Sequence, residues 1–149
     1  MSWHVAGLVV EGDEQEAVAA AVRGLGRSVV GKHLNGDGVP ILECWSADLS
    51  FAFHDEAWAQ LSLGGRALAF YASTEDDCFG FRYYEDGVLA RRLDRKGAVA
   101  LGTGLPLPLE ADLGDAHDGS IVFALITALG FAHTRPRSRR DPRFLRQVA

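Results

Sequence analysis

The residues of this chain that could perform chemistry are scattered, and none belongs to a complete catalytic motif. His54 and Glu56 come closest to an acid–base pair, because an imidazole beside a carboxylate at the start of a helix can exchange protons with a substrate. The same pattern is typical of a solvated helix N-terminus that the helix dipole stabilises. The pair therefore supports only an alternative hypothesis, a small enzyme that uses scattered acid–base residues.

One segment resembles a phosphate-binding loop. Residues 26–33, GRSVVGKH, match the spacing G-x-x-x-x-G-K. His33 stands where a serine or threonine hydroxyl would reach magnesium, and the segment leads from an expected helix into an expected strand, the reverse of a true phosphate loop. We expect no nucleotide site, and the sequence predicts no cofactor.

Neither the histidines nor the acidic residues have the spacing of a metal site. No two of the five histidines lie two or four residues apart. The acidic runs at 75–77 and 112–118 lack the alternate-residue ligand spacing of a calcium loop and are typical of solvated loops. The sequence predicts no metal ligand and no catalytic residue.

Charge is divided unevenly along the chain. Residues 1–134 carry 9 basic and 19 acidic side chains, a net charge of −10, whereas residues 135–149 carry 6 basic and 1 acidic, a net charge of +5. An acidic body argues against broad nucleic-acid binding, which needs a basic face. The arginine-rich tail leaves three readings open: a nucleic-acid adaptor, a segment that folds back on the acidic body, and a solvated tail.

Composition indicates one globular domain. The 149 residues are 48% apolar and 23% charged, which predicts a single domain over 1–134 followed by the tail at 135–149, with a short terminal helix after Asp141-Pro142. Cys44 and Cys78 lie in apolar stretches, as buried thiols do. No signal peptide is evident, and the longest apolar run, 121–129, is half the length of a membrane span. We expect a cytoplasmic protein without a membrane partner; its oligomeric state stays open.

The pattern of apolar residues predicts an α+β fold, a mostly antiparallel sheet of five to seven strands with about three helices packed on it. The clearest signal is a meander at 66–74, 77–85 and 88–94, with Asp86-Gly87 as a type I′ turn. Further strands are expected at 3–11, 28–34 and 39–45, and helices near 13–24, 54–63 and 119–129. Residues 49–53 are read as a short strand or irregular segment, and 102–109 as a loop.

Alternation in the strand at 77–85 separates two faces. Phe79, Phe81 and Tyr83 form the predicted core face, whereas Arg82 and Tyr84 lie on the other. Arginine and tyrosine on a sheet surface are typical of a protein-binding hot spot, although an ordinary sheet that meets water looks the same. The candidate partner-binding residues are these two with five acidic loop residues: Glu75, Asp76, Asp77, Arg82, Tyr84, Asp112 and Asp115.

Several segments together resemble a family. Residues 3–12 read WHVAGLVVEG, an expected Ala-rich helix follows, and the chain later contains FAFH, LSLGG, YASTEDD, FRYYEDGVLAR and ALGF. This resembles a set of small bacterial proteins, some of them similar to immunity proteins of contact-dependent or polymorphic toxin systems. The resemblance covers residues 3–131 and contributes no catalytic motif. It implies a cytosolic protein that binds another protein, and with the acidic body it suggests an immunity protein whose acidic loops occlude a toxin's active site.

Overall fold

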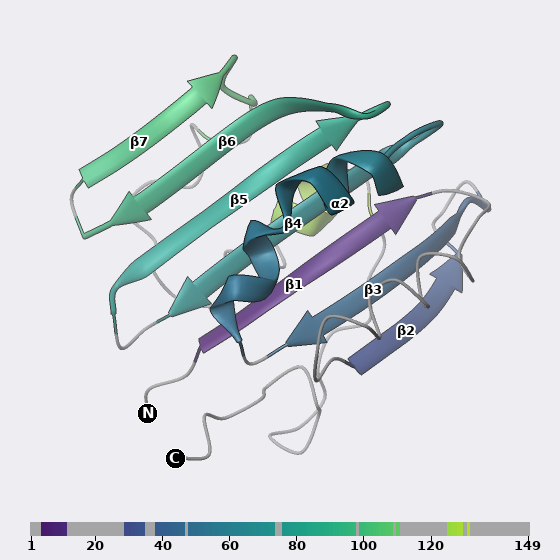
Figure 1. Cartoon of the computed structure of the whole chain (residues 1–149), viewed down its shortest axis with the longest axis horizontal. Coiled ribbons are helices and arrows are strands. Elements are labelled where there is room, and N and C mark those ends of the chain that lie inside the picture. The colour runs from purple at the N-terminus through teal and green to yellow at the C-terminus, as the bar shows by residue number, and fades with distance from the viewer. Residues whose placement is uncertain are drawn as a thin grey trace.

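The computed structural model describes residues 4–11, 29–34, 38–46, 48–73, 76–97, 99–108, 110, 125–129 and 131. These residues form seven β-strands, a 3₁₀ helix (η1) and an α-helix (α2) (Figure 1). In chain order the elements are β1 (His4–Glu11), β2 (Val29–Leu34), β3 (Pro40–Ser46), η1 (Leu49–Phe53), α2 (Asp55–Leu61), β4 (Arg66–Ser73), β5 (Cys78–Glu85), β6 (Val88–Lys96) and β7 (Val99–Gly104).

The strands build a single antiparallel sheet in the order β2-β3-β1-β4-β5-β6-β7 (Figure 1). The predicted meander is confirmed as β4-β5-β6, and positive φ at both Asp86 and Gly87 matches the expected type I′ turn. β1 lies between β3 and β4, as expected for a strand that is apolar on both faces. The chain thus pairs mainly neighbours in sequence, with β1 inserted between β3 and β4.

Helix is scarcer in the described residues than the three helices that the sequence predicted. α2 lies inside the predicted 54–63, and residues 125–128 form a helical turn inside the predicted 119–129. The predicted helix at 13–24 and the tail at 135–149 lie outside the described residues. The described fold is therefore mostly β, and none of its helices has the length and apolarity that crossing a membrane requires.

Two local predictions were wrong. Residues 49–53 are neither strand nor irregular but the 3₁₀ helix η1, because the Asp48 side chain accepts a hydrogen bond from the Ser50 amide at 2.9 Å and caps it. Residues 102–104 are not a loop but the end of β7, because Pro106 and Pro108 follow the strand and do not interrupt its ladder.

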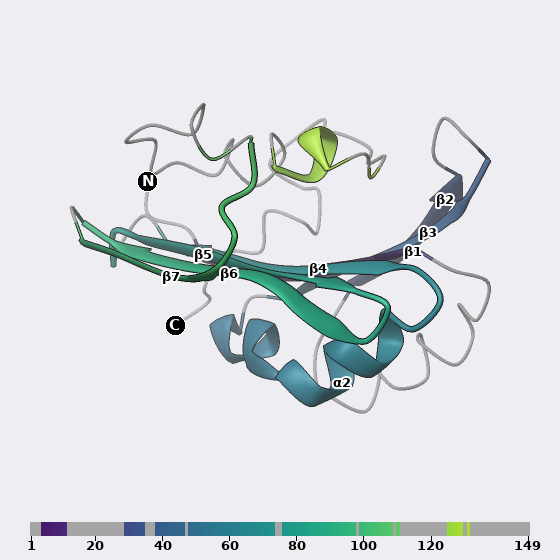
Figure 2. The same cartoon turned by 90° about the horizontal axis from the view of Figure 1, so that it is seen from above.

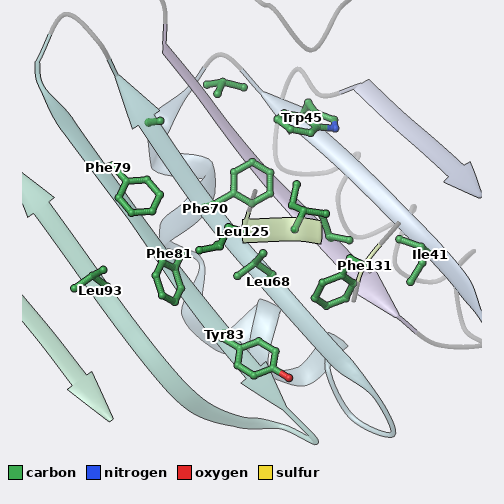
Figure 3. Packing of buried hydrophobic residues seen from close by; sticks show 14 residues of the cluster. Ile41, Trp45, Leu68, Phe70, Phe79, Phe81, Tyr83, Leu93, Leu125 and Phe131 are labelled. Carbon is green, nitrogen blue, oxygen red and sulfur yellow. The ribbon is translucent and has the colours of Figure 1, made fainter. Parts of the chain in front are cut away.

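Both faces of the sheet are covered around its central strands. η1 and α2 pack on one face, which we call the α2 face, and the segment at 125–131 packs on the other, which we call the Phe131 face (Figure 2). The predicted core residues Phe79, Phe81 and Tyr83 lie on the Phe131 face and are buried. They pack in one cluster with Leu125 and Phe131 (Figure 3).

Small side chains on the α2 face let the helices approach the sheet closely. Ala6, Ala67 and Ala69 are fully buried there, in the same cluster as Phe51 and Trp58. The indole Nε1 of Trp58 donates to the carbonyl of Phe51 at 3.0 Å, so α2 and η1 are joined to each other as well as to the sheet. The buried indole thus satisfies its only donor.

Arginines of the sheet hold the segments on the Phe131 face. Arg66 binds both carboxylate oxygens of Glu11 at 3.0 and 2.8 Å, donates to the carbonyl of Leu129, and lies 4.5 Å from the centre of the Phe131 ring. Arg91 is buried and its Nε donates to Glu110 at 2.9 Å. Each guanidinium therefore links a strand of the sheet to a segment that comes after β7 in the sequence.

Two strand glycines let aromatic rings lie flat across a neighbouring strand. Phe70 crosses β1 above Gly7, where a Cβ would stand 2.4 Å from the ring, and meets Trp45 of β3 with 5.0 Å between ring centres. Tyr71 crosses β5 above Gly80 in the same way on the opposite face. Each ring thereby joins strands that are not neighbours.

Gly7→Ala should lower the free energy of unfolding by about 1–3 kcal/mol, because the new methyl group would overlap the buried Phe70 ring. Urea denaturation measures the change. In a Phe70→Leu background the same substitution should cost less, since the shorter side chain removes the closest contact and leaves only the Cys44 carbonyl oxygen, 2.9 Å from the new methyl carbon. An equal cost in both backgrounds would contradict the crossing as its cause.

Candidate binding site around Arg82

Arg82 and Tyr84 do not lie on an exposed face, and that expectation was wrong. Only 1% of the Arg82 side chain is exposed, and Tyr84 is buried as well. Sequence alternation assigned them correctly to the face opposite Phe81, but η1 and α2 cover that face. The two residues therefore support a surface from beneath.

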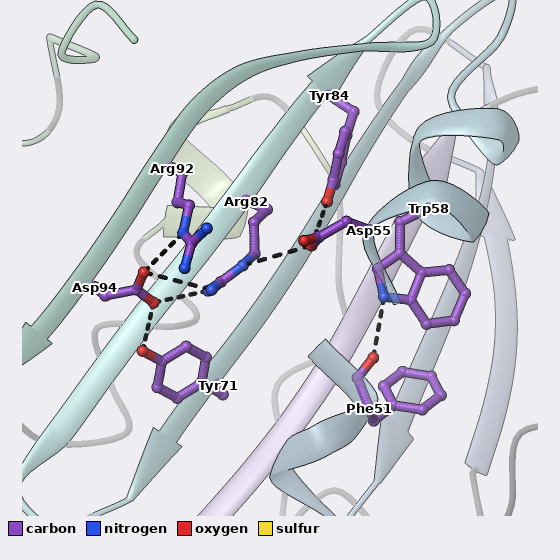
Figure 4. Close-up of polar contacts among 8 residues, drawn as sticks. All are labelled: Phe51, Asp55, Trp58, Tyr71, Arg82, Tyr84, Arg92 and Asp94. Carbon is purple, nitrogen blue, oxygen red and sulfur yellow. Dashed lines mark hydrogen bonds and ion pairs between the residues drawn. The ribbon is translucent and has the colours of Figure 1, made fainter. Parts of the chain in front are cut away.

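The Arg82 guanidinium lies at the centre of a polar cluster (Figure 4). Its Nη1 donates to Asp94 Oδ1 at 2.8 Å, and its Nε lies 3.8 Å from Asp55 Oδ1. The Nε is buried without a hydrogen-bond partner in the structure. The guanidinium carbon also lies 4.5 Å from the centre of the Phe53 ring, a cation–π distance.

Asp94 collects three donors from three strands. Besides Arg82, it accepts from the Tyr71 hydroxyl at 2.6 Å and from Arg92 Nε at 2.9 Å. Tyr71 reaches it because Gly80, the residue of β5 opposite both, has no side chain. Burial alone would raise the pKa of Asp94, but the bonds from Tyr71 and Arg92 and the charge of Arg82 outweigh it and lower the pKa below its usual value.

The tyrosines of the cluster stay protonated at neutral pH. Burial and the hydrogen bond to Asp94 raise the pKa of Tyr71, and burial and the nearby charge of Asp55 raise that of Tyr84, whose hydroxyl lies 3.0 Å from Asp55. The cluster thus holds paired ions and neutral phenols. Such groups can bind and orient a ligand through hydrogen bonds and ring contacts.

Four partly exposed side chains form what we call the Phe53 surface: Phe53, Asp55, Leu89 and Arg92. Phe53, Asp55 and Arg92 lie at the cluster itself, and Leu89 lies beside it, opposite Tyr84 in the β5–β6 pair. The Phe53 ring is 46% exposed, yet it rests on Arg82 and lies 5.1 Å from the Tyr71 ring. An exposed ring held on two sides loses little freedom when a partner covers it. The surface therefore combines an aromatic group with one charge of each sign.

The predicted acid–base pair is not brought together. His54 is half-buried with its ring against Trp58, 5.7 Å between centres, whereas Glu56 is exposed on α2. Within the described residues the two side chains share no hydrogen bond. The same part of the chain contains no group of three potential metal ligands. Both cysteines are free, and burial raises the pKa of the Cys44 thiol to about 12.

The acidic candidates are described only in part. Asp76 and Asp77 are exposed in the turn between β4 and β5, and the carbonyl of Asp77 accepts a hydrogen bond from the Gly97 amide at 2.9 Å. This bond joins the turn to the one between β6 and β7. Glu75, Asp112 and Asp115 lie outside the described residues.

Sequence reasoning missed Phe53, Asp94 and Leu89 as site residues. The available signal was Gly80, because a glycine inside an apolar strand often marks a place where another group approaches closely. Opposite it on β6 stands Asp94, an acid among basic residues. Phe53 carried no signal, since its contact with Arg82 depends on how η1 packs.

Comparisons with protein-family models, curated proteins and solved structures gave no match to this chain.

Asp94→Asn should lower the free energy of unfolding by about 2–3 kcal/mol, because it leaves the buried Arg82 charge without its main partner. Arg92→Gln removes a bond to the same carboxylate, but from a side chain that is partly exposed, and should cost less than about 1 kcal/mol. Urea denaturation at neutral pH measures both. Similar costs would contradict the central role of the Arg82–Asp94 pair.

Stability should fall in acid partly through Asp94. Its pKa in the folded protein lies below the value of about 3.9 in an unfolded chain, so ionised Asp94 stabilises the fold above that pH. The contribution disappears as the pH falls toward the folded-state pKa. The free energy of unfolding of Asp94→Asn should therefore depend less steeply on pH between 5 and 3 than that of wild type. Parallel profiles would contradict this assignment.

Proposed function

We propose that this chain is a non-enzymatic protein-binding domain and that the Phe53 surface is its contact site. One observation carries the proposal: a half-exposed aromatic ring rests on a buried, paired arginine. Binding energy at protein interfaces concentrates in a few aromatic and arginine side chains that are well packed and surrounded by weaker contacts. Phe53 and Arg92 are of these types, and Arg82 and Tyr71 keep the ring in place.

Charge favours a cationic partner. Residues 1–134 carry a net charge of −10, which attracts a positively charged protein over a distance and speeds encounter. The exposed turn with Asp76 and Asp77 is linked to the β6–β7 turn and lies toward the same end of the sheet as Tyr71 and Gly80. The acidic turn would speed association with a cationic partner, and the aromatic ring beside it would distinguish that partner from other proteins at contact.

The resemblance to immunity proteins suggests which kind of protein the partner is. We propose a bacterial protein that neutralises a toxin, with Asp76 and Asp77 reaching basic groups near the toxin's active site and Phe53 anchoring the complex. Of the five acidic loop candidates the structure describes Asp76 and Asp77, and the Phe53 surface adds the apolar contact that acidic loops lack. The partner would be a protein encoded beside this one.

Co-purification with the product of the adjacent gene tests the proposal. At low salt the two proteins should form a complex, and the association rate should fall as salt rises. Phe53→Ala should weaken the complex at least about 30-fold, the effect of losing a hot-spot residue. Surface plasmon resonance with the full chain measures both.

Val88→Ala provides the matched control, because Val88 is an exposed apolar residue that pairs with Glu85 on the Phe131 face. It should leave affinity within about threefold of wild type. Absence of a complex at low salt, or equal losses in the two variants, would contradict the proposed function or its site.

A further inference from the structure

The outer strand β7 is exposed along its whole length. All six of its residues are exposed, including Val99 at 64% and Leu101 at 70%. In the described part of the chain it pairs only with β6, so alternate residues direct their N–H and C=O groups away from the sheet. Arg91 donates to the carbonyls of Thr103 and Gly104 and fixes the end of the strand. The outward backbone groups at the centre of β7, around Leu101, are therefore available to a further strand.

This strand lacks the features by which proteins protect a sheet edge. Charged side chains, prolines and bulges on edge strands discourage pairing with another chain. The sequence of β7, VALGTG, has no charge and no proline, whereas β2 at the opposite edge contains Lys32 in VVGKHL. The two edges therefore differ in sequence, and β7 is the one suited to pairing.

Local charge also favours contact at this edge between two copies of an acidic protein. Three arginines of β5 and β6 are paired with three carboxylates: Arg82, Arg91 and Arg92 with Asp55, Asp94 and Glu110. Arg95 and Lys96 stand opposite Ala100 and Val99 of β7, at the end of the sheet where the turn with Asp76 and Asp77 lies, so two charges of each sign meet there as well. Two bodies of net charge −10 repel each other least where each is locally neutral. The β6 strands of the two copies would lie about 14 Å apart, three strand spacings, which exceeds the screening length of about 8 Å at physiological salt.

We infer that β7 pairs antiparallel with β7 of a second copy and joins the two sheets into one. The two copies would be related by a two-fold axis perpendicular to the joined sheet. In an antiparallel pair, residues opposite each other have their side chains on the same face, so the axis must pass through a residue that faces its own copy. Centring on Leu101 places the two Leu101 side chains together and Val99 opposite Thr103 of the partner. Leu101 and Val99 share the face of Asp94, so their exposed apolar area becomes covered.

The contact is a short strand pair, so the dimer should be weak and dependent on concentration. This inference is independent of the proposed function, because it concerns the protein alone. Sedimentation equilibrium of the full chain over two decades of concentration should show a monomer–dimer equilibrium. Leu101→Lys, which opposes like charges at the axis, should make the protein monomeric, with circular dichroism and melting temperature unchanged because Leu101 is exposed.

Cysteine crosslinking tests the register. In a Cys78→Ser background, Leu101→Cys should form a disulfide-linked dimer on oxidation, because opposed Cα atoms of an antiparallel pair are within bridging distance. Val99→Cys is the matched control on the same strand and face; its copies would be about 14 Å apart and should not crosslink. A monomer at every concentration, a dimer that survives Leu101→Lys, or equal crosslinking of both cysteines would overturn the inference. The inference would also be overturned if β7 were found to pair only with a strand of a different protein.

Discussion

Buried and half-buried arginine–carboxylate pairs fix how the layers of this protein sit on its sheet. Arg82 holds η1 and the start of α2 through Phe53 and Asp55, while Arg66 and Arg91 hold the segments that lie on the Phe131 face. An apolar sheet accepts an apolar helix in many positions of similar energy, because hydrophobic contact has little directionality. A guanidinium in a dry environment instead requires its carboxylate in one place. We therefore expect these pairs to add specificity of packing more than net stability.

The glycines make this arrangement possible from within the strands. Gly80 leaves the space through which Tyr71 reaches Asp94, and Gly7 leaves the space through which Phe70 reaches Trp45. Tyr71 and Phe70 are consecutive on β4, so they cross the sheet on opposite faces and toward opposite edges. β4 thus acts as the centre from which both faces are organised. The Arg82 cluster depends on this, since Asp94 without Tyr71 would lose one of its three donors.

The sequence was informative about strands and poor about what covers them. Alternation placed Phe81 and Arg82 on opposite faces, and the Asp86-Gly87 turn located the meander, because both signals are local. The same alternation suggested a wet Arg82 face, since a polar strand face cannot reveal that a distant helix buries it. η1 and β7 were missed for a similar reason: a capping aspartate and a Gly-rich strand acquire meaning only beside their partners. The proposed contact surface was missed for the same reason, because Phe53 is held by a contact between η1 and the sheet.

In the proposed complex, long-range and short-range forces have different tasks. The net negative body creates a field that acts beyond contact distance and weakens with salt, so it affects how quickly a partner arrives. The Arg82 cluster is nearly neutral and acts only at contact, where the position of the Phe53 ring affects how long a partner stays. A neutral, rigid site inside an acidic surface lets association be fast without binding every basic protein tightly. On this proposal the buried, paired Arg82 acts only as a support, and the exposed Phe53 ring makes the contact.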